Sequence, residues 1–265
     1  MAFVESGGRR LYVQVHGEGA PLLLLHGGGS NAATWWQQLP DFSARHRCIT
    51  MDLRGFGRSA APMDEFRHEC FVADVVAVLD HLGLERVSVL GQSLGGMVGL
   101  RLALQHPQRV AAFVACDSPL GVDHAGIRDA LERRARRADA QTLEQRALGR
   151  WFLQCHPEGA ALYAQINAFN PGTHSVSPAE WKAAMARLMD PAQLLPMDAL
   201  RALHCPVLWL VGAEDPLVPV QAMRDAQALV PSSELAVVAD CGHSTYFEKP
   251  AVFNPLVLDF LSRRT

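Results

Sequence analysis

Ser93 lies in a segment whose composition suits an exposed nucleophile. The segment 91–96 reads GQSLGG and joins the apolar run 86–90 to the helical pattern 97–104. A sharp turn from a buried strand into a helix forces unusual backbone angles on its central residue, and neighbouring glycines remove the clashes that side chains would cause. The serine hydroxyl is then held at the carboxyl end of a sheet, over the positive end of a helix. The competing interpretation is a glycine-containing turn with an incidental serine, and the short motif alone does not decide between them.

Two further residues could complete a nucleophilic site around Ser93. A serine hydroxyl needs a base to take its proton, and the base needs an acid to fix its tautomer. His243 and Asp215 each follow an apolar, strand-like run, as Ser93 does. Asp117 also follows such a run and is the alternative acid, although it could equally cap a helix or a loop.

Apolar runs and their periodicity indicate an alternation of strands and helices. Strands are predicted at 10–15, 21–25, 47–51, 86–90, 110–116, 206–211 and 235–238, and helices at 71–82, 97–104, 223–229 and 252–261. This alternation predicts the α/β class, with helices on both faces of a mostly parallel sheet. Ligands of such sheets bind at the carboxyl ends of the strands. The post-strand residues should therefore converge on one edge; they are His26, Ser93, Asp117, Asp215 and His243.

The pattern of apolar residues changes in 120–203 and predicts a helical cap. This cap is inserted after the sixth strand of a core formed by 1–119 and 204–265. The segment lacks long β-branched runs and enters from the edge that carries the site, so it should cover that site. It contains an arginine-rich stretch with Arg128, Arg133, Arg134, Arg136, Arg137, Arg146 and Arg150. One of them could bind a substrate carboxylate. The spacings Asp129–Arg133 and Glu132–Arg136 favour instead a solvated helix with ion pairs.

Composition and charge argue against several classes of protein. The chain has 265 residues, of which 49% are hydrophobic and 19% charged, as is usual for a globular protein. A net charge of −3 gives no electrostatic case for nucleic acid or an anionic membrane, and no apolar run could span a bilayer. The six cysteines are scattered without metal-ligand spacing, so we expect neither a metal site nor disulfides, and no cofactor. The start carries no secretion-signal pattern, which predicts a cytoplasmic protein; the oligomeric state, a homo-oligomer included, stays open.

Five motifs, taken in order, resemble the α/β-hydrolase superfamily over nearly the whole chain. They are His26-Gly27-Gly28, Asp52-x-Arg54-Gly55-x-Gly57-x-Ser59, the Ser93 turn, Gly212-x-x-Asp215-x-x-Val218-Pro219, and Gly242-His243 with Glu248-x-Pro250 behind it. The resemblance implies the α/β-hydrolase fold, with an eight-stranded sheet. It also implies a catalytic triad of Ser93, Asp215 and His243, and the context of 212–219 favours Asp215 over Asp117 as its acid.

The resemblance assigns further residues to the surroundings of this triad. The backbone N–H groups of Gly28 and Leu94 would meet the oxyanion. The pocket for a small-molecule substrate is expected to include His26, Trp35, Gln92 and Trp151. The ring of His26 is better explained as a structural tie between loops.

Individual residues indicate which branch of the superfamily the chain resembles. Serine as nucleophile argues against its haloalkane dehalogenases and epoxide hydrolases, which use aspartate at that position. C–C hydrolases of meta-cleavage products share the glycine-rich loop but usually carry an aromatic residue directly after the histidine, where this chain has Ser244. The resemblance therefore implies hydrolysis of an ester or a lactone. A C–C hydrolase is the alternative within the superfamily, and a ligand receptor with vestigial hydrolysis is the alternative of another class.

Overall fold

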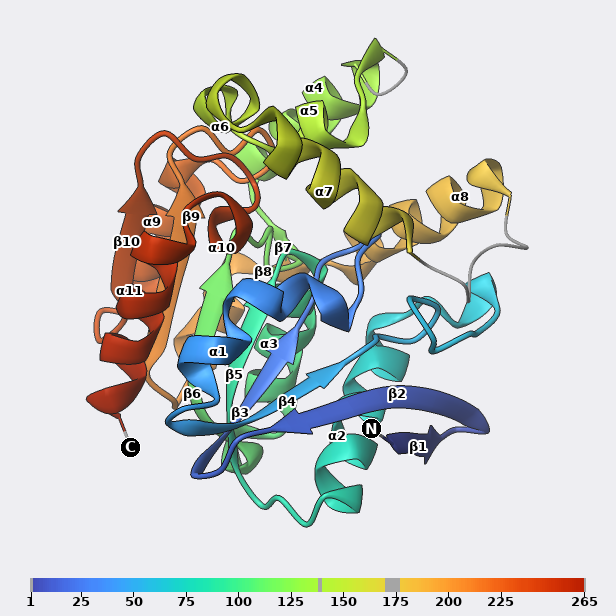
Figure 1. Ribbon diagram of the computed structural model, residues 1–265, viewed down its shortest axis with the longest axis vertical. Helices are drawn as coiled ribbons and strands as arrows, with labels where there is room; N and C mark the ends of the chain where they lie inside the picture. The colour runs from blue at the N-terminus through green and yellow to red at the C-terminus, as the bar shows by residue number, and fades with distance from the viewer. Residues whose placement is uncertain (1, 138–139, 170–176, 265) are drawn as a thin grey trace.

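The computed structural model describes residues 2–137, 140–169 and 177–264. Its centre is an eight-stranded sheet with the strand order β1-β2-β4-β3-β5-β6-β9-β10 (Figure 1). The pairs β1/β2 and β2/β4 are antiparallel, and all other neighbouring strands are parallel. The predicted fold class, a mostly parallel sheet flanked by helices, is confirmed.

The strands and helices of the core follow the predicted alternation. The sheet is formed by β1 (Ala2–Ser6), β2 (Arg9–His16), β3 (Ala20–Leu25), β4 (His46–Met51), β5 (Val87–Gln92), β6 (Val110–Cys116), β9 (Val207–Gly212) and β10 (Glu234–Val238). The core helices are α1 (Leu39–Phe42), α2 (His68–His81), α3 (Leu94–Gln105), α9 (Val220–Leu229), α10 (Thr245–Glu248) and α11 (Pro250–Ser262). The sequence prediction lacks β1, a five-residue edge strand that pairs only with β2.

Both faces of the sheet are covered, which explains why β3 reads as a continuous apolar run. Leu23 and Leu25 pack in one cluster, and Leu22 and Leu24 in another. Side chains of α2, α3 and α9 belong to the first cluster, and those of α1 and α11 to the second. Alternate residues of one strand thus face two separate helix layers. In the part of the chain that the structure describes, no helix is both long and apolar enough to cross a membrane.

A helical cap stands over the carboxyl ends of the parallel strands (Figure 1). It contains α4 (Ala125–Arg137), α5 (Leu143–Ala147), α6 (Arg150–Cys155), α7 (Pro157–Ala168) and α8 (Pro178–Leu188). At its base, β7 (Val122–Asp123) pairs with β8 (Leu195–Pro196). Leu148 and Gly149 are extended and separate α5 from α6, and Gly149 lies against the backbone of Gly242.

Ser93 stands between β5 and α3 in a strained conformation. Its φ of 48° and ψ of −109° lie outside the regions that residues with a side chain prefer. The turn is possible because the chain segments approach so closely that neighbouring positions admit no side chain. A Cβ atom at Gly95 would lie 2.1 Å from the carbonyl oxygen of Leu25, and one at Gly91 would lie 2.3 Å from that of Gly95.

We expect Gly95→Ala to lower the free energy of unfolding by about 3 kcal/mol, because the new Cβ would force the backbone of β3 and α3 apart. Gly8→Ala is the matched control: Gly8 has a positive φ but open space around it, so it should cost only about 1 kcal/mol. Urea unfolding measures both. Equal costs would show that the close approach of α3 to β3 is not a constraint.

Candidate active site

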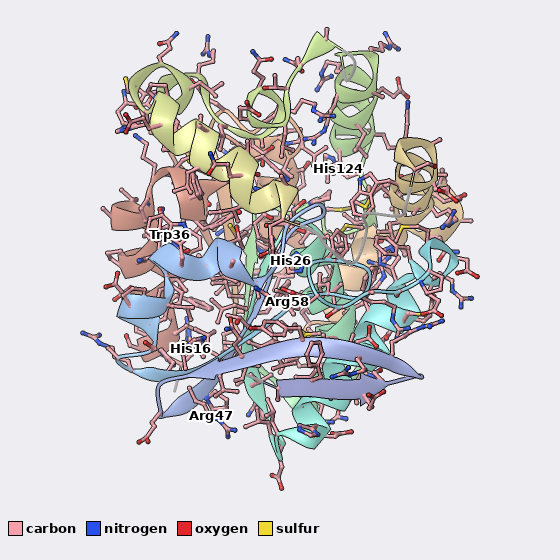
Figure 2. All side chains as sticks on the ribbon, turned by 45° about the vertical axis from the view of Figure 1, so that its right-hand side comes forward. His16, His26, Trp36, Arg47, Arg58 and His124 are labelled. Carbon is pink, nitrogen blue, oxygen red and sulfur yellow. The ribbon has the colours of Figure 1, made fainter. Side chains whose placement is uncertain are left out.

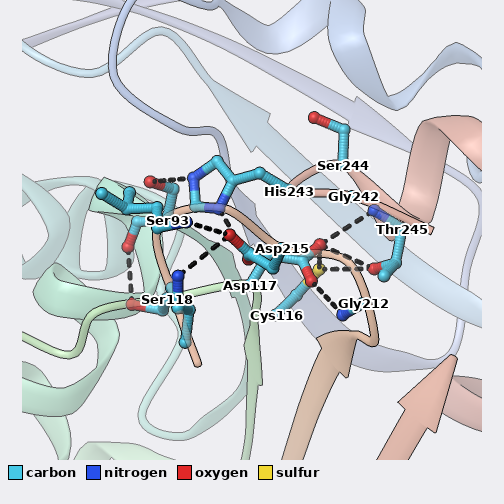
Figure 3. A network of polar contacts seen from close by, with 12 residues as sticks. Ser93, Cys116, Asp117, Ser118, Gly212, Asp215, Gly242, His243, Ser244 and Thr245 are labelled. Atoms are coloured by element: carbon cyan, nitrogen blue, oxygen red, sulfur yellow. Dashed lines mark hydrogen bonds and ion pairs between the residues drawn. The ribbon is translucent and has the colours of Figure 1, made fainter. Parts of the chain in front are cut away.

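Ser93, His243 and Asp215 form a continuous chain of hydrogen-bonding side chains (Figure 3). The Nε2 atom of His243 lies 3.0 Å from Ser93 Oγ, and its Nδ1 atom lies 2.8 Å from Asp215 Oδ2. The other carboxylate oxygen of Asp215 accepts hydrogen bonds from the backbone N–H groups of Leu217 and Val218, at 2.8 and 2.9 Å. A carboxylate at Nδ1 keeps the ring proton there and leaves Nε2 free to accept the serine proton.

Asp117 lies close to this chain but does not contact His243. It accepts hydrogen bonds from the N–H of Gly212 at 3.0 Å, and from the N–H and hydroxyl of Thr245 at 2.8 Å each. Burial, and after it the charge of Asp215, raises the pKa of Asp117 to about 6. The structure thus brings Asp215, and not Asp117, to the histidine. Asp117 joins the ends of β6 and β9 to the start of α10.

Hydrogen bonds hold the turn around Ser93. Its N–H donates to the carbonyl of Cys116 at 2.9 Å, and its carbonyl accepts from the hydroxyl of Ser118 at 2.7 Å. Leu94 is the first residue of α3, where a backbone N–H has no acceptor within the helix. Gly28 is exposed in the loop after β3, and a Cβ there would lie 2.8 Å from the terminal methyl of Met185 on α8. The oxyanion role of Gly28 and Leu94 stays a prediction.

Two of the expected pocket residues, His26 and Gln92, make supporting hydrogen bonds. The ring of His26 donates from Nδ1 to the carbonyl of Gly27 at 2.8 Å, and its Nε2 accepts from the N–H of Leu53 at 2.9 Å. Burial lowers the pKa of His26, which favours this neutral ring. Figure 2 shows it in the interior, below the cap helices. Gln92 donates from Nε2 to the carbonyl of His243 at 2.9 Å, so it links the nucleophile turn to the histidine loop.

The two tryptophans expected in the pocket differ in their exposure. Trp35 has no exposed surface and packs against the ring of Tyr246 at 4.9 Å between centroids. Trp151 is 38% exposed, and its ring lies 3.4 Å from the ammonium of Lys249 and 5.0 Å from the ring of His156. Trp35 is a core residue with no surface for a substrate, so its placement in the pocket is corrected. Trp151 lies where the cap meets α11, and its place in the pocket stays a prediction.

Glu248 supports the histidine loop, a role that the sequence analysis does not assign to it. Its carboxylate accepts hydrogen bonds from the N–H of Gly242 at 3.0 and 3.1 Å and from the N–H of Ser244 at 3.3 Å, on either side of His243. It also accepts from the N–H of Gly149 in the cap at 2.8 Å. Burial raises the pKa of Glu248 to about 7, against the effect of these donors. The motif Glu248-x-Pro250 is the sequence feature that could have indicated this role.

The cap itself reaches the histidine. The N–H of His243 donates to the carbonyl of Ala147 at 2.6 Å, and the hydroxyl of Ser244 donates to that of Tyr163 on α7 at 3.0 Å. Sequence reasoning could not find these contacts, since they join segments about a hundred residues apart. Among the residues that the structure describes, no three His, Cys, Asp or Glu side chains are grouped so as to hold a metal ion.

Comparison with known families accounts for the fold and for the order of the three residues. The family model of the alpha/beta hydrolase fold matches residues 20–151 and 133–250. The chain belongs to the α/β-hydrolase family. This membership supports hydrolase activity and does not by itself specify the substrate.

Similar proteins act on different substrates. A 2-hydroxymuconate semialdehyde hydrolase of Pseudomonas sp. (strain CF600) is 30% identical, over 97% of this chain and 92% of its own. The 3-oxoadipate enol-lactonase 2 of Acinetobacter baylyi is 28% identical, over 91% of this chain and 88% of its own. Among solved structures, Est816, described as an N-acyl homoserine lactone degrading enzyme, has a TM-score of 0.82 and 29% identity, over 97% of this chain and 99% of its own.

In this α/β-hydrolase, we expect Asp215→Asn to lower kcat by roughly four orders of magnitude, because the amide favours the wrong histidine tautomer. Asp117→Asn should leave kcat within about tenfold but lower the free energy of unfolding by about 1–3 kcal/mol, because it disturbs buried hydrogen bonds. Steady-state kinetics and urea unfolding of both variants check this. The reverse order of the two kcat losses would make Asp117 the acid.

The raised pKa of Glu248 predicts a pH dependence of stability. Between its ordinary value of 4.5 and about 7, the folded protein binds a proton that the unfolded chain releases. This contribution to the free energy of unfolding therefore falls as the pH rises through that range. Glu248→Gln cannot titrate, so it should lose less stability than the wild type between pH 4.5 and 7.5.

Urea unfolding at the two pH values measures this difference, and Glu158→Gln at an exposed position is the control. The control should keep the wild-type pH dependence. If Glu248→Gln also keeps it, Glu248 does not titrate in this range.

Proposed function

We propose that this α/β-hydrolase cleaves carboxylic esters or lactones through an acyl-enzyme on Ser93. The observation that carries the proposal is the pair of hydrogen-bonding distances along the chain, 3.0 Å from Ser93 Oγ to His243 Nε2 and 2.8 Å from His243 Nδ1 to Asp215 Oδ2. These distances are those required for proton transfer from the hydroxyl and for orientation of the ring.

In the first half of the reaction, Ser93 Oγ attacks the acyl carbon while its proton moves to His243 Nε2. The imidazolium that forms is stabilised by the buried carboxylate of Asp215. Collapse of the tetrahedral intermediate breaks the bond to the alkoxy group, which takes the proton from Nε2 and leaves as the alcohol. In a lactone, that alcohol stays attached to the acyl group.

In the second half, water replaces the alcohol. His243 takes a proton from the water, whose oxygen attacks the ester of Ser93, and then returns the proton to Ser93 Oγ as the acid leaves. In both halves the negative oxygen would be met by the N–H groups of Leu94 and Gly28. Each such donor contributes about 3 kcal/mol to the stability of the transition state.

A C–C hydrolase is the second candidate, and one observation favours it. The 2-hydroxymuconate semialdehyde hydrolase of Pseudomonas sp. (strain CF600) shares 30% identity over 97% of this chain. Against it stands Ser244, which follows the histidine where an aromatic residue is usual in that branch. The hydroxyl of Ser244 here binds Tyr163. A screen of short esters, lactones and dienoic C–C substrates separates the two candidates.

We expect the purified protein to hydrolyse p-nitrophenyl butyrate and Ser93→Ala to lose that activity by at least about 10⁴-fold, since it removes the nucleophile. Release of p-nitrophenolate measures both. Ser262→Ala, at an exposed position far along α11, should retain wild-type turnover. Equal turnover by wild type and Ser93→Ala would refute the acyl-enzyme. Binding of esters without turnover by the wild type would favour a receptor.

A further inference from the structure

The arginines of the cap divide into those with an acidic partner and those without. Within the arginine-rich stretch 128–150, three form ion pairs: Arg128 with Asp123, Arg136 with Glu132 at 3.5 Å, and Arg150 with Glu214 at 3.2 Å. Such exposed pairs explain these side chains as parts of a solvated surface. The expected pair Asp129–Arg133 is absent from the ion pairs of the described residues, and the side chain of Arg137 lies outside what the structure describes.

Arg134 does not fit the solvated-surface explanation. Its side chain is half-buried on the inner part of α4, and it forms no ion pair with any carboxylate of the described residues. Its hydrogen bond goes from one terminal nitrogen to the carbonyl of Arg146, at 3.1 Å. A guanidinium has five N–H donors. None of its nitrogens is among the buried polar atoms that lack a partner, and the hydrogen bond to Arg146 uses only one of the donors.

The backbone of 146–147 links Arg134 to the histidine loop of the candidate active site. Arg146, whose carbonyl it binds, precedes Ala147, whose carbonyl accepts the N–H of His243. The electrostatic effects of Asp215 and Tyr163 raise the pKa of Arg134, against the larger effect of burial. The hydroxyl of Tyr163 also binds Ser244, the neighbour of His243. At the other end of α4, His124 binds Asp225 of α9 at 2.9 Å and fixes the foot of the helix (Figure 2).

The charges around Arg134 leave a place for an anion. Burial, and after it the neighbouring charge of Arg146, lowers the pKa of Arg134; both effects would be relieved by a bound negative group. The acidic group that acts on Arg134, Asp215, is engaged with His243. Its charge would repel an anionic substrate unless a cation on the cap compensated it.

We propose that Arg134 binds a carboxylate of the substrate, so that the enzyme prefers acyl groups that carry a free acid. This proposal rests on the proposed function, because it adds a recognition site to the pocket in which Ser93 attacks the ester or lactone. Arginine suits the task, since its planar fork binds both oxygens of a carboxylate. The partial burial of Arg134 strengthens that interaction relative to one at the surface.

The test compares anionic and neutral esters of similar length. The substrates are the mono-p-nitrophenyl esters of succinic, glutaric and adipic acid, against p-nitrophenyl butyrate, valerate and hexanoate. Arg134→Gln should lower kcat/KM for the best anionic ester by at least about tenfold, mainly through KM, and change that of the neutral esters less than about twofold. Arg134→Lys should retain part of the preference. Arg133→Gln, an exposed neighbour on the same helix, should behave as the wild type.

A binding experiment separates this proposal from the proposed function. Ser93→Ala protein should bind glutarate or adipate in calorimetry, Ser93→Ala with Arg134→Gln should not, and Ser93→Ala with Arg133→Gln should. If no ester is turned over but this pattern holds, the proposed function fails and the carboxylate site stands. The carboxylate site is refuted by equal losses on anionic and neutral esters, by binding that Arg134→Gln leaves unchanged, or by no binding at all.

Discussion

The arrangement of the site depends on the backbone of Ser93. A φ of 48° with a ψ of −109° costs of the order of 1–3 kcal/mol and persists only where the surroundings enforce it. Two hydrogen bonds to the segment 116–118 hold the turn. The close approach of Gly95 on α3 to the carbonyl of Leu25 restricts the path of the backbone further. Contacts with the central sheet thus compensate the strain. The Ser93 hydroxyl lies at the edge of the sheet where the loops that follow the strands meet.

The histidine loop depends on both the core and the cap. Gln92 binds the carbonyl of His243 from the nucleophile turn, and Ala147 binds its N–H from the cap. Glu248 accepts hydrogen bonds from Gly149 and from the two residues that flank the histidine. The cap is therefore a structural support of the base as well as a cover. A change in the junction between α5 and α6 should therefore shift the backbone of His243 as well.

Local sequence patterns predict the polar residues that follow the strands. Ser93, Asp215 and His243 could be found because each follows an apolar run and because parallel strands end at one edge. Strand β1 was missed, since a five-residue edge strand is specified by its partner more than by its own pattern. The prediction for Trp35 is wrong because residue type does not distinguish a buried core ring from one that lines a pocket. The supporting roles of Gln92 and Glu248, and the partial burial of Arg134, arise from tertiary contacts that no local pattern encodes.

Covalent labelling can show whether Ser93 is a nucleophile activated by His243 and Asp215. A fluorophosphonate reacts with an activated serine and leaves a stable adduct that intact-mass and peptide mass spectrometry locate. We expect one adduct per chain, on Ser93 in the peptide containing 91–96, with labelling slowed by orders of magnitude in Asp215→Asn and His243→Ala. Labelling at another residue, or equally fast labelling of Ser93 without His243, would contradict it.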